Sequence, residues 1–307
     1  MTSEAVHRTI SSPKSALAAG IALMLVGCFM FSLNDTAGKW LVATYSVGQL
    51  LLIRSIAALA VLVPFIRREG WAAFTEAPRP RLQILRVALS SLEVALFYWA
   101  VVYLPLADVT TFYLAGPIFV TALSPFLLNE TIGWKRCAAV IAGFVGVLVA
   151  MRPSTASFGL PALIALSGSI LFALLMIVTR TLRGTSDTAL VTTQMIGSLI
   201  LGAILAPFGW VTPSARDFVL LLLLGVVAML AHVCVNRSLK LAPASLVVPY
   251  QYTLILWAMV LGYLVFGDVP ETLLVLGAAI IVAAGVFIFW RERLTAGDGS
   301  TFPPPAA

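Results

Sequence analysis

The stretch LPLADVTTFYLAGPIFVTALSPFLLNE at residues 104–130 is echoed by LAPASLVVPYQYTLILWAMVLGYLVFGD at residues 241–268. Both stretches open on Leu with Pro close behind, continue as apolar sequence with internal Pro, and end on an acidic residue. Their first residues lie 137 positions apart and their last residues 138. The offset continues to Arg152 and Arg291, which lie 139 positions apart. This nearly constant spacing predicts that the chain consists of two repeats.

Ten apolar runs of about twenty residues divide the chain, five in each repeat. The predicted spans are 16–37, 47–66, 82–103, 108–128, 134–151, 159–180, 189–209, 217–236, 244–266 and 272–291. Each approaches the ~20 residues that a helix needs to cross ~30 Å of hydrocarbon. Because five is odd, the second repeat enters the bilayer from the opposite side, a pattern typical of secondary transporters. We therefore predict an all-α integral membrane protein, with ten transmembrane helices arranged as two inverted five-helix repeats around a central cavity.

The domain boundaries follow from these spans. We expect a cytoplasmic tail at 1–15, a first five-helix repeat at 16–152 and a second at 158–291. Residues 294–307 are rich in Gly and Pro and are predicted to be a disordered tail.

Composition supports a membrane protein and argues against several other classes. Hydrophobic residues make up 61% of the chain, charged residues 10%, and the mean hydropathy is +1.03, whereas soluble domains hold ~45–50% apolar and ~25% charged residues. The net charge of +6 comes from basic residues in short loops, so no nucleic-acid partner is predicted. The chain has neither a phosphate-binding G-x-x-x-x-G-K-[ST] loop nor an H-E-x-x-H motif. We predict a lipid bilayer and a small-molecule metabolite as partners, and no enzyme activity, cofactor or metal.

The distribution of Lys and Arg predicts the orientation. Fifteen of the nineteen fall in or beside the loops on one side of the predicted spans. Basic residues accumulate on the cytoplasmic side of membrane proteins. We therefore predict a multi-pass protein of the bacterial inner (plasma) membrane with both termini cytoplasmic and with residues 152–158 and 267–271 periplasmic.

Four charged residues fall within or near the first three spans. Glu93 is the twelfth residue of the third span, and Arg54 lies in the second. Asp35 lies near the end of the first span, and Lys39 follows it at i+4, just beyond that end. A charge at a helix centre costs about 2.5–3.5 kcal/mol on insertion scales, and such residues usually face a cavity or one another. The four charges sum to zero, so they either neutralise one another or line a substrate pathway. The depth of Glu93 favours the pathway. Asn34, next to Asp35, is predicted to belong to the same pathway.

A second polar group lies in the eighth span. His232, Asn236 and Lys240 follow at i, i+4 and i+8, so they share one helix face. His232 either lines the pathway or only bonds to a neighbouring carbonyl. Lys240 is read as a cytoplasmic anchor.

Aromatic residues gather at matching positions of the two repeats. Tyr113 and Tyr250 are 137 residues apart and are therefore equivalents. Gln251 is next to Tyr250, Trp257 shares its helix face, and Phe97 shares that of Glu93. Trp and Tyr also form belts at membrane interfaces, which is the alternative reading of such clusters. Prolines 117, 125 and 249 interrupt the two echoed stretches and free backbone carbonyls beside the expected site. The predicted substrate-binding and pathway residues are Asn34, Asp35, Arg54, Glu93, Phe97, Tyr113, His232, Asn236, Tyr250, Gln251 and Trp257.

The repeat, the basic inner loops and the acidic ends of the echoed stretches resemble the EamA family of the drug/metabolite transporter superfamily. The resemblance covers about residues 16–291, so both repeats are EamA-like. Family members often carry Gly-Glu where helices four and nine end. This chain has Asn129-Glu130 and Gly267-Asp268 there, a mild departure. The resemblance implies ten helices and a central cavity lined mainly by helices 1, 3, 4, 6, 8 and 9.

Several short motifs resemble a metabolite-uptake branch of this family that includes bacterial riboflavin and S-adenosylmethionine carriers. They are Asn34-Asp35, Lys39-Trp40, Gly48-Gln49, Arg54-Ser55, Leu128-Asn129-Glu130 and Pro249-Tyr250-Gln251-Tyr252. The resemblance implies uptake of a small organic metabolite, with riboflavin first. A flat neutral ring suits aromatic faces and a set of charges that sum to zero. The alternatives are export of amino acids or related metabolites, and S-adenosylmethionine uptake, because adenine also stacks.

The orientation can be tested with reporter fusions. A reporter in residues 67–81 should be active in the cytoplasm, and one in residues 152–158 should be active in the periplasm, because the basic loops stay inside. Placement of residues 67–81 outside the cytoplasm contradicts the inverted-repeat interpretation.

Overall fold

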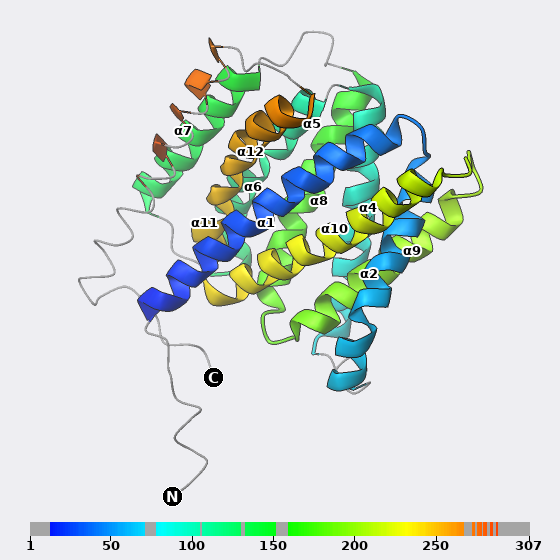
Figure 1. Cartoon of the computed structure of the whole chain (residues 1–307). Coiled ribbons are helices and arrows are strands. Elements are labelled where there is room, and N and C mark those ends of the chain that lie inside the picture. The colour runs from blue at the N-terminus through cyan, green and yellow to red at the C-terminus, as the bar shows by residue number, and fades with distance from the viewer. Residues whose placement is uncertain are drawn as a thin grey trace, which may run out of the picture.

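The described part of the chain folds entirely into helices (Figure 1). The structure is a computed structural model that describes residues 13–70, 78–104, 106–129, 133–151 and 159–266, with short helical pieces between 272 and 287. Its helices are α1 (Pro13–Val42), α2 (Val47–Glu69), α4 (Pro80–Tyr103), α5 (Leu106–Tyr113), α6 (Gly116–Leu127), α7 (Trp134–Met151), α8 (Leu160–Thr181), α9 (Asp187–Leu205), α10 (Ala215–Leu241), α11 (Ala244–Val247), the 3₁₀ segment η2 (Val248–Thr253), α12 (Leu254–Leu261) and η3 (Gly262–Phe266).

The first nine predicted spans all fall on helices. Seven helices of the described chain are long and apolar enough to cross a membrane. The predicted span 108–128 is not one of them, because it is broken into α5 and α6. The span 272–291 is described only in pieces, and the loops 152–158 and 267–271 lie outside the described residues.

The helix breaks occur at equivalent places in the two repeats. In the first repeat, α5 ends at Tyr113 and α6 begins at Gly116, with Pro117 in its first turn. In the second, the 3₁₀ segment η2 contains Pro249 and Tyr250. Proline has no backbone N–H and cannot continue the hydrogen-bond ladder of an α-helix. The breaks expected from Pro117 and Pro249 are thus present near the equivalent tyrosines. The interruption expected at Pro125 is wrong, because α6 continues through it to Leu127 and a membrane helix tolerates the loss of one backbone hydrogen bond.

Two serine caps repeat as well. Ser46 caps α2 by accepting a hydrogen bond from the backbone N–H of Gln49 at 3.3 Å, and Ser186 caps α9 by accepting one from Ala189 at 3.0 Å. The two serines are 140 residues apart. A side-chain oxygen at this position satisfies a backbone donor that the helix leaves unpaired. The second helix of each repeat therefore begins in the same way.

The two halves do not pack as separate units, because long helices of one half pack along helices of the other. Helix α1 packs along α10, α4 along α8, and α2 along α9 (Figure 1). In repeat order these are helices 1 with 8, 3 with 6, and 2 with 7. Exchanging the two halves converts the first pair into the second and leaves the third unchanged. The interface between the halves is therefore pseudo-symmetric.

Two glycines allow close approach at this interface. A Cβ atom added at Gly225 on α10 would collide with the carbonyl oxygen of Arg54 on α2. A Cβ at Gly202 on α9 would lie 2.5 Å from the backbone nitrogen of Leu52. Small residues let membrane helices pack backbone to backbone, so these contacts fix the depth of α2.

The structure explains the Asn in the Asn129-Glu130 motif. Asn129 follows α6 and has a φ angle of 53°. Glycine adopts this left-handed conformation most easily, and Asn is enriched there among other residues. Asn129 therefore follows α6 in a conformation that otherwise favours glycine.

Gly225→Ala should destabilise the protein, because its methyl group would force α10 away from α2. Overpacking of this kind costs about 1–3 kcal/mol. The apparent melting temperature in detergent should fall measurably. Gly184→Ala is the matched control, because a Cβ there meets nothing within 4 Å. Equal melting temperatures for both variants would contradict the close-packing argument.

Candidate functional site

A buried polar group lies where α1, α2 and α4 meet. The Nδ2 atom of Asn34 donates to the hydroxyl of Tyr98 at 2.9 Å and lies 3.2 Å from Oδ1 of Asp35. The Arg54 guanidinium approaches the same hydroxyl at 3.4 Å and lies 5.7 Å from the centre of the Tyr98 ring. Arg54 is 2% exposed, and its Nε, like Oδ1 of Asn34, has no hydrogen-bond partner among the described residues. The group therefore retains hydrogen-bonding capacity.

Glu93 on α4 is buried beside this group. It is 9% exposed, and its charge interacts with those of Arg54 and Asp35. Within the described chain its carboxylate forms no hydrogen bond and no ion pair. Of the four charged side chains, Glu93 and Arg54 are buried, Asp35 is half-buried and Lys39 is exposed. That they line a substrate pathway stays a prediction.

Aromatic rings adjoin Glu93 on one side. Phe97 meets Tyr98 and Tyr113 edge to face, with ring centres 5.4 Å and 5.1 Å apart. The Tyr113 hydroxyl donates to the backbone carbonyl of Glu93 at 3.0 Å. Tyr113 also lies against Gly168 of α8, where a Cβ would overlap its hydroxyl. An apolar surface of aromatic rings thus lies next to Glu93.

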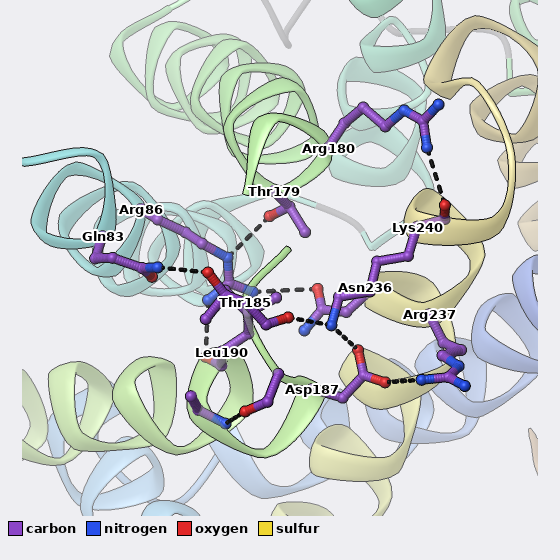
Figure 2. A network of polar contacts seen from close by, with 12 residues as sticks. Gln83, Arg86, Thr179, Arg180, Thr185, Asp187, Leu190, Asn236, Arg237 and Lys240 are labelled. Carbon is purple, nitrogen blue, oxygen red and sulfur yellow. Dashed lines mark hydrogen bonds and ion pairs between the residues drawn. The ribbon is translucent and has the colours of Figure 1, made fainter. Parts of the chain in front are cut away.

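A second polar group surrounds Arg86, two helical turns before Glu93 (Figure 2). Arg86 is 1% exposed. Its Nε donates to the Thr179 hydroxyl at 2.9 Å, and its NH1 to the carbonyl of Leu190 at 2.8 Å. Its NH2 donates to Oε1 of Gln194 at 3.0 Å and to Oδ1 of Asn236 at 3.1 Å. One side chain of α4 is thereby joined to α8, α9 and α10.

His232 belongs to this second group. Nε2 of Gln194 lies 3.0 Å from one ring nitrogen of His232 and 3.2 Å from the other. The His232 ring also meets Phe31 of α1 edge to face at 5.0 Å. The amide of Gln194 therefore links His232 to Arg86, and the partner of His232 is a side chain of α9.

The predicted residues of the ninth span, which lie in η2 and α12, form a third group. Trp257 meets Phe29 of α1 at 4.8 Å, and Nε2 of Gln251 lies 4.0 Å from the sulfur of Met176. The Gln251 carbonyl oxygen and the Trp257 indole nitrogen have no hydrogen-bond partner among the described residues. Tyr250 is buried in the core cluster that includes Val247. The rings expected to stack on a substrate are thus divided, with Tyr113 beside Glu93 and Trp257 against α1.

Sequence reasoning missed Tyr98, Gln194 and Arg86 as site residues. Arg86 lies near the start of its predicted span, 82–103, and is one of the fifteen basic residues that the sequence assigns to the cytoplasmic side. Gln194 could have been found, because it is a polar residue within an apolar span. Among the described residues, no group of three His, Cys, Asp or Glu side chains could hold a metal ion.

A pocket of about 360 Å³ lies away from the Arg86 group, where α1 ends and α10 begins. It is lined by Lys39, Trp40, Leu41, Ala43, Thr44, Tyr45 and Asp217. The Tyr45 hydroxyl donates to Oδ2 of Asp217 at 2.7 Å, and this hydrogen bond raises the pKa of Tyr45. Gln49 closes the neighbouring loop by bonding to both the N–H and the carbonyl of Val211, at 3.0 Å and 2.6 Å.

Known proteins of similar sequence are membrane transporters. An S-adenosylmethionine uptake transporter of Rickettsia prowazekii is 26% identical over 277 residues, which cover 89% of this chain and 93% of that one. A riboflavin transporter of Vibrio cholerae is 26% identical over 280 residues, covering 89% and 94%. A pseudopaline exporter of Pseudomonas aeruginosa is 26% identical over 273 residues, covering 87% and 95%.

The fold is also known. A crystal structure of a protein with 17% sequence identity matches with a TM-score of 0.73 over 92% of this chain and 99% of that chain. The model of the EamA-like transporter family matches twice, at residues 18–152 and 159–290. These two matches correspond to the two repeats and cover most of the sequence. The chain therefore belongs to the EamA-like transporter family, whose members are multi-pass membrane transporters and not enzymes.

Proposed function

We propose that this protein is an inner-membrane secondary transporter that takes up a small aromatic metabolite with a positive charge, and that S-adenosylmethionine is the first candidate. The observation that carries the proposal is Glu93, a buried carboxylate with no hydrogen bond or ion pair in the described chain. Buried charges are normally paired. A cationic group of the substrate would complete the site.

The local charge balance supports a cationic substrate. Among the described residues, Asp35 and Glu93 have only Arg54 as a nearby buried cation, an excess of one carboxyl over guanidinium groups. Arg86 does not remove this excess locally. It lies seven residues from Glu93, about 10 Å along the helix, and its hydrogen bonds go to four other acceptors. A neutral ligand would leave the excess unanswered.

The aromatic residues support an adenine-containing ligand. Phe97 and Tyr113 present ring surfaces beside Glu93. Aromatic faces stack on flat heterocycles and also attract cations such as a sulfonium group. The relatives named as S-adenosylmethionine uptake transporters match over almost the whole chain.

Riboflavin is the second candidate. The aromatic group and the free hydrogen-bonding atoms of Asn34, Gln251 and Trp257 suit a flat ring with a polar edge, and the riboflavin transporters of Vibrio cholerae and Rhizobium johnstonii match equally well. Because riboflavin is neutral, the charge of Glu93 distinguishes the two candidates. The pseudopaline exporter among the relatives keeps export as the alternative direction.

The proposed transport path lies between two inverted repeats, at residues 16–152 and 158–291. The pseudo-symmetric pairing of α1 with α10 and of α4 with α8 supports this arrangement. The broken helices beside Tyr113 and Tyr250 support a site near the bilayer midplane, because transporters typically bind substrate at such breaks. Both termini are proposed to be cytoplasmic.

Glu93→Gln should reduce uptake of S-adenosylmethionine into proteoliposomes by about 10- to 100-fold. A hydrogen bond to a charged group contributes about 1.5–3 kcal/mol, and about 1.4 kcal/mol corresponds to a tenfold change in affinity. Glu93→Asp keeps the charge and should retain part of the activity. Size-exclusion chromatography checks that both variants are folded. Unchanged uptake by folded Glu93→Gln protein over a range of pH would refute the role of Glu93.

The substrate charge can be tested by competition. S-adenosylhomocysteine lacks the sulfonium methyl group and its positive charge but is otherwise the same molecule as S-adenosylmethionine. With the wild-type protein, S-adenosylhomocysteine should inhibit uptake of labelled S-adenosylmethionine at least about tenfold more weakly than unlabelled S-adenosylmethionine does. With Glu93→Gln the two compounds should inhibit equally, because only the carboxylate distinguishes them. Accumulation of riboflavin without accumulation of S-adenosylmethionine would instead establish the second candidate.

A further inference from the structure

We propose that two neighbouring groups of polar contacts, one around Arg86 and one around Asp187, together form a gate that closes the cytoplasmic end of the transport path. We call it the Arg86–Asp187 gate. Its side chains are Gln83, Arg86, Thr179, Thr185, Asp187, Gln194, Asn236, Arg237 and Lys240. The inference rests on the proposed orientation and on transport between the two repeats, but not on the identity of the substrate.

The outer layer of the gate consists of ion pairs at the ends of helices (Figure 2). Asp187, the first residue of α9, contacts the Arg237 guanidinium at 2.9 Å and the Lys240 ammonium at 2.6 Å. Lys240 also donates to the backbone carbonyl of Thr185. Nε2 of Gln83 donates to the Thr185 hydroxyl at 2.8 Å. These contacts tie the start of α4 and the end of α10 to the α8–α9 turn.

The inner layer is the group around Arg86. Because Arg86 belongs to the first repeat and all four of its acceptors to the second, it holds the two repeats together. Relative movement of the repeats is the motion that alternating access requires. Arg86 therefore lies across the interface that must open to release substrate inwards.

The chemistry of the network suits a reversible seal. All four acceptors of Arg86 are neutral, so no carboxylate has to be separated from it in the membrane interior. Water can replace each hydrogen bond when the end opens, and the net contribution of such bonds is small because water competes for both partners. Apolar side chains exposed in the same way would regain nothing from water. Nδ2 of Asn236, buried without a partner among the described residues, is already available for hydration.

The opposite end of the molecule is built differently. By the pseudo-symmetry of the two repeats, α10 is the equivalent of α4. Tyr45 is the equivalent of Thr185, which lies 140 residues further along the chain. The bond from Tyr45 to Asp217 resembles the bond between Thr185 and Gln83, because each joins a loop residue to the first turn of a long helix of the other repeat. Deeper in α10, however, residues 218–224 read FVLLLLL and provide no counterpart to Arg86. The pocket of about 360 Å³ lies at that end, lined by Lys39, Tyr45 and Asp217 among others.

Thiol labelling tests the gate without a substrate. The three native cysteines, Cys28, Cys137 and Cys234, are replaced and a single cysteine is placed at Ser90, a buried position one turn from Arg86. Among the described residues its hydroxyl bonds only to the Val87 carbonyl of its own helix, so the replacement disturbs little. A charged, membrane-impermeant methanethiosulfonate is applied to inside-out vesicles and, separately, to intact spheroplasts.

Asp187→Asn and Arg86→Gln should each speed labelling in inside-out vesicles by at least about tenfold, because each weakens the closed state. Labelling from the outside should not speed up. Tyr45→Phe is the matched control: it removes the corresponding hydrogen bond at the opposite end and should not accelerate labelling from the inside. If Arg86→Gln does not fold, Asp187→Asn, whose ion pairs lie at the helix ends, decides alone.

Two results would overturn the gate. One is unchanged labelling of folded Asp187→Asn protein, and the other is acceleration from the outer side. Failure of the proposed substrate would leave these labelling rates unaffected, because the readout contains no substrate. The two proposals therefore fail separately.

Discussion

A charge inside a bilayer has to find its partners within the protein, and Arg54 and Arg86, the two buried arginines among the described residues, do so in different ways. Arg86 is satisfied by neutral groups from three helices of the opposite repeat. Arg54 interacts at longer range with Asp35 and Glu93 and keeps an unpaired Nε. The first arrangement is a closed contact between repeats, whereas the second leaves capacity for a ligand. Both lie at the interface where the halves exchange helices.

The backbone supports this division of roles. The fourth and ninth predicted spans are interrupted, between α5 and α6 near Tyr113 and in η2 at Tyr250, where prolines remove backbone donors. Elsewhere glycines bring α10 and α9 against the backbone of α2. The rigid contacts therefore hold Arg54 at a fixed depth, while the irregular segments lie beside the aromatic groups. Pseudo-symmetry gives both ends similar caps and loops, and the side chains of α4 and α10 make the two ends different.

The candidate site could be predicted in part. Glu93, Asp35 and Arg54 stood out because charges are rare within apolar spans, and the structure brings them into electrostatic contact. Their balance could not be predicted, since the exposure of Lys39 depends on where α1 ends and which way its last turn faces. Arg86 was overlooked for a similar reason. A basic residue near the start of a span usually anchors at the membrane surface, and only packing against α8, α9 and α10 buries it.

The sequence by itself determined the helical membrane class, the two repeats, nearly every helix position and the two helix breaks, because span length, hydropathy and proline chemistry are local properties. Only the tertiary structure decided which helices of the two halves pair, which rings share a cluster, and which buried charges remain uncompensated. Those features depend on contacts between residues more than a hundred positions apart, such as Arg86 with Asn236 and Tyr45 with Asp217. No local pattern encodes such a contact.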